Sequence, residues 1–71
     1  MNEYSESIIE AFLDDVRHCD MYSPEGILIT DARRSEHPNL CLHIKDDAGI
    51  VWELTKVAAI SFITNCTFEE D

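Results

Sequence analysis

Residues 40–54, with the sequence LCLHIKDDAGIVWEL, decide the fold class of this 71-residue chain. The first six residues place large apolar side chains at every second position, and so do the last five. A period of two indicates a strand that is buried on one face. The DDAG turn at 46–49 separates the two runs, and its Gly49 can adopt the positive φ that a tight hairpin favours. The sequence therefore predicts two antiparallel strands, at about 39–46 and 49–55.

Upstream of the hairpin, the apolar residues follow the 3.6-residue period of a helix. One stripe of this period consists of Ile8, Ile9, Phe12, Leu13 and Val16. Acidic residues open the segment, and Arg17 and His18 close it, which suits the helix dipole. Pro24 disfavours helical geometry in the residue before it. We therefore expect a helix at about 3–19.

Two further apolar runs flank the hairpin and complete the predicted sheet. The run GILITDAR at about 26–33 is strand-like, and residues 57–65 are uncharged and rich in apolar side chains. We expect strands at both places and a frayed tail at 68–71. One helix followed by about four strands predicts a single α+β domain over residues 1–71. In this domain the N-terminal helix packs on one face of an antiparallel sheet.

Residues 52–62, WELTKVAAISF, resemble the closing hairpin of SH3-like and Sm-like barrels. In those barrels a strand leads through a short turn into a final apolar strand. A helix ahead of the barrel is similar to the Sm-like plan and to a small acidic bacterial inhibitor of the transcription terminator Rho. The resemblance extends over about a third of the chain. It implies a small, partly closed barrel as the form of the sheet and regulation of transcription as the function.

The charge balance excludes several classes of protein. Asp and Glu number 15 against 5 Lys and Arg, which gives a formal charge of −10 with His neutral. A nucleic-acid-binding protein requires a basic patch, so we expect no direct contact with nucleic acid. No apolar run approaches the roughly 20 residues of a membrane helix, and no basic start precedes an apolar stretch. We therefore expect neither a membrane span nor a secretory signal.

Cysteine usage indicates a reducing compartment. The three cysteines, Cys19, Cys41 and Cys66, are an odd number at wide spacings. A secreted domain of this size that depends on disulfides carries an even and denser set. We expect reduced thiols and a cytoplasmic protein, which would lie in the host cytoplasm if the chain is phage-encoded.

Cys41 and His43 are the strongest candidates for chemistry. They cluster in sequence with His37, and alternate positions on a strand would place Cys41 and His43 side by side, where zinc or a nucleophilic thiol could use them. A structural zinc site takes four ligands, however, and the other candidates, His18, Cys19 and Cys66, are scattered. The sequence holds no glycine-rich phosphate loop and no nucleophile elbow. We therefore expect no metal, no cofactor and no catalytic activity.

The feature with most functional content is a stripe of acidic residues on the predicted helix. Its members lie three or four positions apart, at Glu3, Glu6, Glu10 and Asp14. Like charges at this spacing cost a helix about 0.2–0.5 kcal/mol per pair. The stripe either keeps the protein in solution or makes contact with a partner. Carboxylates about 5–6 Å apart along a helix can take the positions of phosphates in a basic groove.

Our leading hypothesis is a non-enzymatic, stoichiometric inhibitor or regulator that mimics nucleic-acid phosphates. It would block the basic groove of a nucleic-acid-binding protein, as small acidic phage proteins block CRISPR effectors and other defence enzymes. Two tyrosines near the acidic residues would serve as anchors. The predicted partner-binding residues are Glu3, Tyr4, Glu6, Glu10, Asp14, Asp15 and Tyr22.

Two alternatives use other surfaces. If residues 57–63 formed an exposed strand edge, pairing with a second copy would protect it, which predicts a homo-oligomeric interaction module. The other alternative is a transcription regulator similar to the Rho inhibitor.

Overall fold

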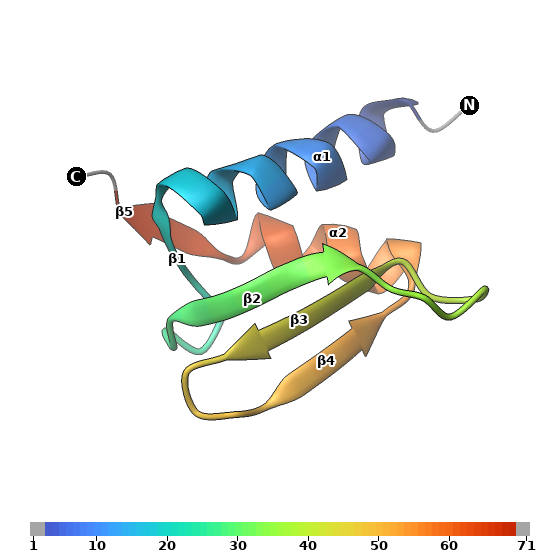
Figure 1. Ribbon diagram of the computed structural model, residues 1–71. Coiled ribbons are helices and arrows are strands. Elements are labelled where there is room, and N and C mark those ends of the chain that lie inside the picture. Colours follow the sequence, from blue (N-terminus) through green and yellow to red (C-terminus); the bar gives the residue numbers. More distant parts are fainter. Residues whose placement is uncertain (1–2, 70–71) are drawn as a thin grey trace.

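The computed structural model describes residues 3–69. Its elements, in chain order, are α1 (Glu3–His18), β1 (Asp20–Tyr22), β2 (Ile29–Arg34), β3 (Leu42–Asp46), β4 (Val51–Leu54), α2 (Lys56–Thr64) and β5 (Thr67–Glu69). Strands β2, β3 and β4 form an antiparallel sheet in chain order, and the short strands β1 and β5 form a separate antiparallel pair. Figure 1 shows α1 and α2 running alongside the three-stranded sheet. The α+β class is confirmed, and the sheet is not closed into a barrel.

The core lies between the two helices and the inner face of the three-stranded sheet. Its buried side chains include Ile9 and Phe12 of α1, Leu42 and Ile44 of β3, and Ala59 of α2. The apolar stripe of the predicted helix and the alternation of the predicted strand therefore meet in one cluster. Both helices cover the same face of the sheet, and the other face carries polar side chains such as Arg33, His43 and Glu53 together with the exposed Val51.

The hairpin between β3 and β4 has the turn that its sequence predicts. Asp46 is 1% exposed, and its Oδ1 accepts from the backbone N–H of Ala48 at 3.0 Å and of Ile50 at 2.9 Å. Gly49 has a φ of 85°, which glycine adopts without a steric cost. The buried carboxylate and the glycine together fix the register of β3 against β4.

The prediction of a strand at 57–65 is wrong, because this segment belongs to α2. Thr55 caps the helix, since its Oγ1 accepts from the Ala58 N–H at 3.3 Å. Two consecutive alanines also favour helix over strand. A short apolar run does not distinguish a buried strand from a buried helix, so the cap and the alanines were the more informative signals.

Two further expectations fail with that strand. Residues 52–62 hold the end of β4 and most of α2, so they do not form the closing hairpin of an SH3-like or Sm-like barrel. Residues 57–63 offer no strand edge for pairing with a second copy. The partial barrel is replaced by an open sheet with two helices on one face.

The other boundaries lie close to the predicted ones, with two additions. The helix ends at His18, and the strands expected at 26–33, 39–46 and 49–55 are present as shorter strands. The additions are β1 and β5, which pair so that Met21 faces Phe68. The tail expected to fray at 68–71 is therefore paired as far as Glu69, and residues 70–71 lie outside the described residues.

Replacement of the cap residue tests the helical structure of 56–64. The Thr55→Ala variant should lower the free energy of unfolding by about 0.5–2 kcal/mol, because the Ala58 N–H loses its side-chain acceptor. Thr55→Asp keeps an acceptor and should stay close to wild type in the same urea titration. Equal stability of the three proteins would contradict the cap.

Candidate functional site

The predicted acidic stripe lies along α1, but its members have different surroundings. Glu3 is the first residue of the helix, and its side chain lies outside the described part of the structure. Glu6 is half-buried, whereas Glu10 and Asp14 are exposed. The stripe is therefore continuous along the backbone without being a uniform surface.

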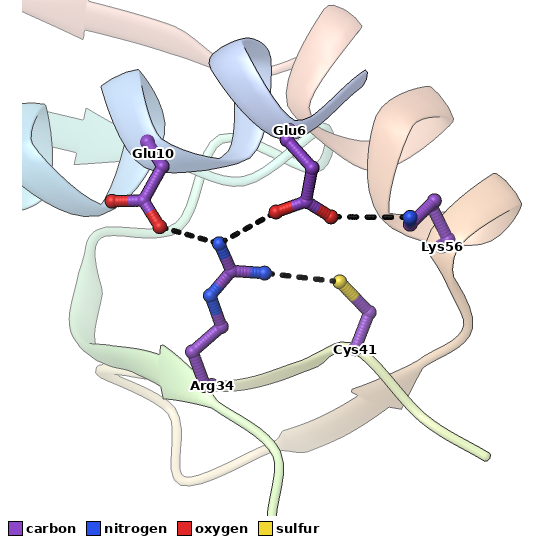
Figure 2. A network of polar contacts seen from close by, with 5 residues as sticks. All are labelled: Glu6, Glu10, Arg34, Cys41 and Lys56. Carbon is purple, nitrogen blue, oxygen red and sulfur yellow. Dashed lines mark hydrogen bonds and ion pairs between the residues drawn. The ribbon is translucent and has the colours of Figure 1, made fainter. Parts of the chain in front are cut away.

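A single guanidinium binds two members of this stripe. Arg34 Nη2 donates to Glu6 Oε1 at 3.0 Å and to Glu10 Oε2 at 2.5 Å (Figure 2). Lys56 Nζ lies 3.1 Å from Glu6 Oε2, and Arg34 Nη1 donates to Cys41 Sγ at 3.7 Å. We call Glu6, Glu10, Arg34, Cys41 and Lys56 the Arg34 cluster. It ties α1 to β2 and to the start of α2.

The Arg34 cluster favours the charged forms of Glu6 and Arg34. Hydrogen bonds from Lys56 and then from Arg34 hold the pKa of Glu6 below its ordinary value. The carboxylate of Glu10, with a smaller effect of Glu6, raises the pKa of Arg34. Two of the 5 Lys and Arg residues of the chain therefore neutralise carboxylates inside the molecule. The middle of the predicted contact stripe carries little net charge.

The place of Arg34 in the sheet explains why it reaches α1. Arg34 faces Leu42 across the β2–β3 pair, so its stem leaves on the inner face of the sheet, beside the helix. Its planar fork can bridge two carboxylates that lie one helical turn apart. Sequence reasoning missed this contact because Arg34 lies 28 residues from Glu6 and 24 residues from Glu10.

Four carboxylates near the end of α1 and on the adjoining strand pair have no Lys or Arg as ion-pair partner within residues 3–69. Asp14 and Asp15 are exposed near its last turn, and Asp20 of β1 faces Glu69 of β5 across the strand pair. We call these four residues the acidic end. Within residues 3–69, the ion pair of Asp14 with His18, at 3.7 Å between Oδ1 and Nδ1, is the only one that any of the four makes. Asp20 and Glu69 were absent from the predicted set, because their meeting depends on the pairing of two short strands.

The two tyrosines predicted as anchors lie at opposite ends of α1. Tyr4 is on the first turn and is 80% exposed. Tyr22 is on β1, beyond the last turn, and its hydroxyl donates to Glu69 Oε1 at 3.4 Å. They do not flank one common site, and only Tyr22 adjoins the acidic end.

A second polar cluster lies on the outer face of the sheet. His43 Nδ1 is 2.6 Å from Glu53 Oε2, and Ser35 Oγ donates to Glu53 Oε1 at 2.8 Å. An ionised carboxylate only accepts, so the geometry assigns the proton to Nδ1. His43 first, and then Ser35, hold the pKa of Glu53 below its ordinary value. Ser35 binds the carboxylate and not the imidazole, which differs from the arrangement that activates a serine.

Cys41 and His43 do not form the pair expected from alternate strand positions. Cys41 precedes β3, and its side chain contacts Arg34 and packs against the core, whereas His43 contacts Glu53. Among residues 3–69, no group of three or more His, Cys, Asp and Glu side chains is placed to hold a metal ion. The expected zinc pair is therefore split between two clusters.

Comparisons of the chain with protein-family models, with curated proteins and with solved structures find no match. In the described part of the chain, neither helix has the length and apolar character needed to cross a bilayer. The function is therefore inferred from the geometry and charge of this chain itself.

Removal of the Arg34 guanidinium should destabilise the protein. Arg34→Met keeps the apolar stem but leaves Glu6 and Glu10 as like charges one turn apart, so we expect Tm to fall by about 2–5 °C. Arg33→Met is the matched control, since Arg33 lies on the other face of β2 and makes no ion pair with any described residue. The difference between the variants should shrink at about 1 M salt. Equal Tm values at low salt would show that the Arg34 cluster does not hold α1 to the sheet.

The Glu53 contacts predict a component of acid unfolding. Because the folded-state pKa is lowered, their stabilisation is complete above the ordinary value of 4.5 and is lost as the pH falls through the lowered value. The Tm of Glu53→Gln should therefore fall by less than the Tm of wild type when the pH is lowered from above 4.5 through the lowered pKa of Glu53. Glu36→Gln, an exposed loop residue with no polar side-chain contact to a described residue, is the control and should follow wild type. Parallel pH profiles for wild type and Glu53→Gln would contradict this assignment.

Proposed function

We propose that this protein is a non-enzymatic, stoichiometric inhibitor or regulator that binds the basic groove of a nucleic-acid-binding protein. The acidic end is the contact surface in this proposal, and its carboxylates take positions where the groove otherwise holds phosphates. The observation that carries the proposal is the unequal distribution of cations. Glu6 and Glu10 are neutralised by Arg34 and Lys56, whereas no Lys or Arg of residues 3–69 forms an ion pair at the acidic end.

Asp20 and Glu69 supply a reason for a partner's cation to bind. Residues directly opposite in an antiparallel pair have Cβ atoms about 4.5–5.5 Å apart, and like charges there are destabilising. The Tyr22 hydroxyl contacts Glu69 but brings no positive charge. A Lys or Arg of the partner beside the two carboxylates would relieve their repulsion. The loss of this unfavourable electrostatic energy would favour formation of the complex.

The net charge of −10 adds attraction at longer range. Complementary charge accelerates encounter with a basic groove and makes the rate sensitive to salt. CRISPR effectors and other defence enzymes that a phage must inhibit are partners of this kind, in the cytoplasm of the host cell. A regulator of transcription would use the same surface against a DNA- or RNA-binding protein, and the identity of the partner separates these two cases.

Neutralisation of the acidic end tests the proposal. A variant with Asp14→Asn, Asp15→Asn and Asp20→Asn should capture basic nucleic-acid-binding proteins from a cell lysate roughly tenfold less efficiently than wild type. Duplex DNA added to the lysate should compete with wild-type capture, because both occupy the same groove. Mass spectrometry of the eluted proteins provides the measurement.

The control variant carries the same change of charge elsewhere. Asp31→Asn, Glu36→Gln and Asp47→Asn lie outside the acidic end, on β2 and in two loops. This variant should capture the same proteins as wild type. If both triple variants lose capture equally, only net charge matters and the acidic end is not the contact surface. If neither loses capture, the phosphate-mimic function is wrong.

A further inference from the structure

Helix α2 is rich in apolar residues, and its exposed positions combine Val57 with the polar residues Lys56, Ser61 and Thr64. Its sequence, KVAAISFIT, has a single charged residue, at its first position. Ala59 is its one fully buried residue, and Val57 is 82% exposed. Ile60 and Ile63 are only half-buried, so with Val57 they leave apolar surface uncovered on the side of α2 that borders α1.

That open side continues across α1 as a groove. A hollow of about 400 Å³ is lined by Val57 and Ile60, and a second hollow of about 250 Å³ by Ile8, Ile63 and Phe68. The two adjoin, because Ile60 and Ile63 are one turn apart on α2. We define the α1–α2 groove by Ile8, Ala11, Val57, Ile60, Ile63 and Phe68.

The groove contains two of the large apolar side chains that are exposed on this molecule, Val57 and Phe68. Phe68 is 56% exposed at one end, and Tyr4 lies one turn before Ile8 on α1. Burial raises the pKa of the nearby Cys66 thiol to about 11, so the groove wall carries a neutral thiol at physiological pH. An apolar hollow bordered by polar residues is a candidate site of protein contact.

The charges that border the groove indicate which kind of segment it would bind. Two ionisable side chains bear formal charge among the residues lining the two hollows, Asp15 at one end and Lys56 at the other. Lys56 is already paired with Glu6, so the charge left without an ion-pair partner is the carboxylate of Asp15, which also belongs to the acidic end. A second copy of the chain would bring a further −10 of charge toward this end. A basic segment gains attraction where a second copy meets repulsion.

We propose that the α1–α2 groove binds an amphipathic helix of the partner, with its apolar side in the groove and its Lys and Arg residues facing Asp15. Helix-in-groove recognition uses apolar anchors at i, i+3, i+4 and i+7. The two hollows between α1 and α2 could each receive anchors of one such helix. This proposal rests on the proposed function, because it names the segment of the same basic partner that supplies the apolar anchors. In this proposal the acidic end increases the rate of association, and the apolar groove provides the contacts that slow dissociation.

The test uses synthetic peptides as probes on the full chain. One peptide is an amphipathic helix of Leu and Lys, and the other has the same length and charge with Ser in place of Leu. Binding is followed by fluorescence anisotropy and by backbone amide NMR shifts of the protein. We expect the Leu/Lys peptide to bind at least about tenfold more tightly, with shifts at Ile8, Ile63 and Phe68.

A matched pair of variants locates the contact. Val57→Ser should weaken binding of the Leu/Lys peptide by about tenfold, because one exposed valine no longer becomes buried. Val51→Ser makes the same change at a 48% exposed valine on β4 and should leave binding unchanged. Serine and valine have similar helix propensities, so α2 should persist in the first variant, and its amide spectrum checks this.

Three results would overturn the inference. Equal binding of both peptides, with shifts confined to the acidic end, would leave the proposed function standing and remove the groove from it. Binding of neither peptide would count against the groove and the proposed function together. A mass that doubles with concentration, with shifts in the groove, would assign the groove to a second copy of the chain.

Discussion

The bridge from Arg34 to Glu6 and Glu10 decides which carboxylates of α1 are paired within the chain. Like charges one turn apart on α1 would destabilise the helix by repulsion. The Arg34 guanidinium lies between them, cancels this repulsion and connects α1 to the sheet. Lys56 brings α2 into the same arrangement. Glu6 and Glu10 therefore serve the fold, while Asp15 near the last turn of α1 and Asp20 beyond it have no ion-pair partner within residues 3–69.

Local patterns were enough to predict the elements whose signals repeat within a few residues. The helix at 3–18 and the hairpin from Leu42 to Leu54 follow from a 3.6-residue stripe and a two-residue alternation. Helix α2 was mistaken for a strand because its apolar residues leave no polar face from which to determine a period. The Thr55 cap held the information that the apolar pattern lacked.

Contacts between distant residues account for what was missed at the candidate site. Asp14 and Asp15 follow from their place on the predicted helix. Asp20 and Glu69 come together only through the pairing of β1 with β5, and strands of three residues carry no periodic signal. Glu6, Glu10 and Asp14 lie on α1 at successive helical turns, as their spacing in the sequence predicts. Arg34 of β2 lies between the carboxylates of Glu6 and Glu10, so these two residues hold α1 to the sheet.

Net charge and exposed apolar surface have opposite effects on the solubility of a protein. A high charge keeps molecules apart, whereas an uncovered apolar helix draws them together. In this chain the two features adjoin, because Asp15 belongs to the acidic end and also lines the α1–α2 groove. A solubilising surface gives no reason to place an exposed phenylalanine, Phe68, in the same hollow as Asp15. A surface that must attract a basic partner and then hold it gives such a reason, since charge mainly sets the rate of encounter and apolar burial sets the lifetime of the complex.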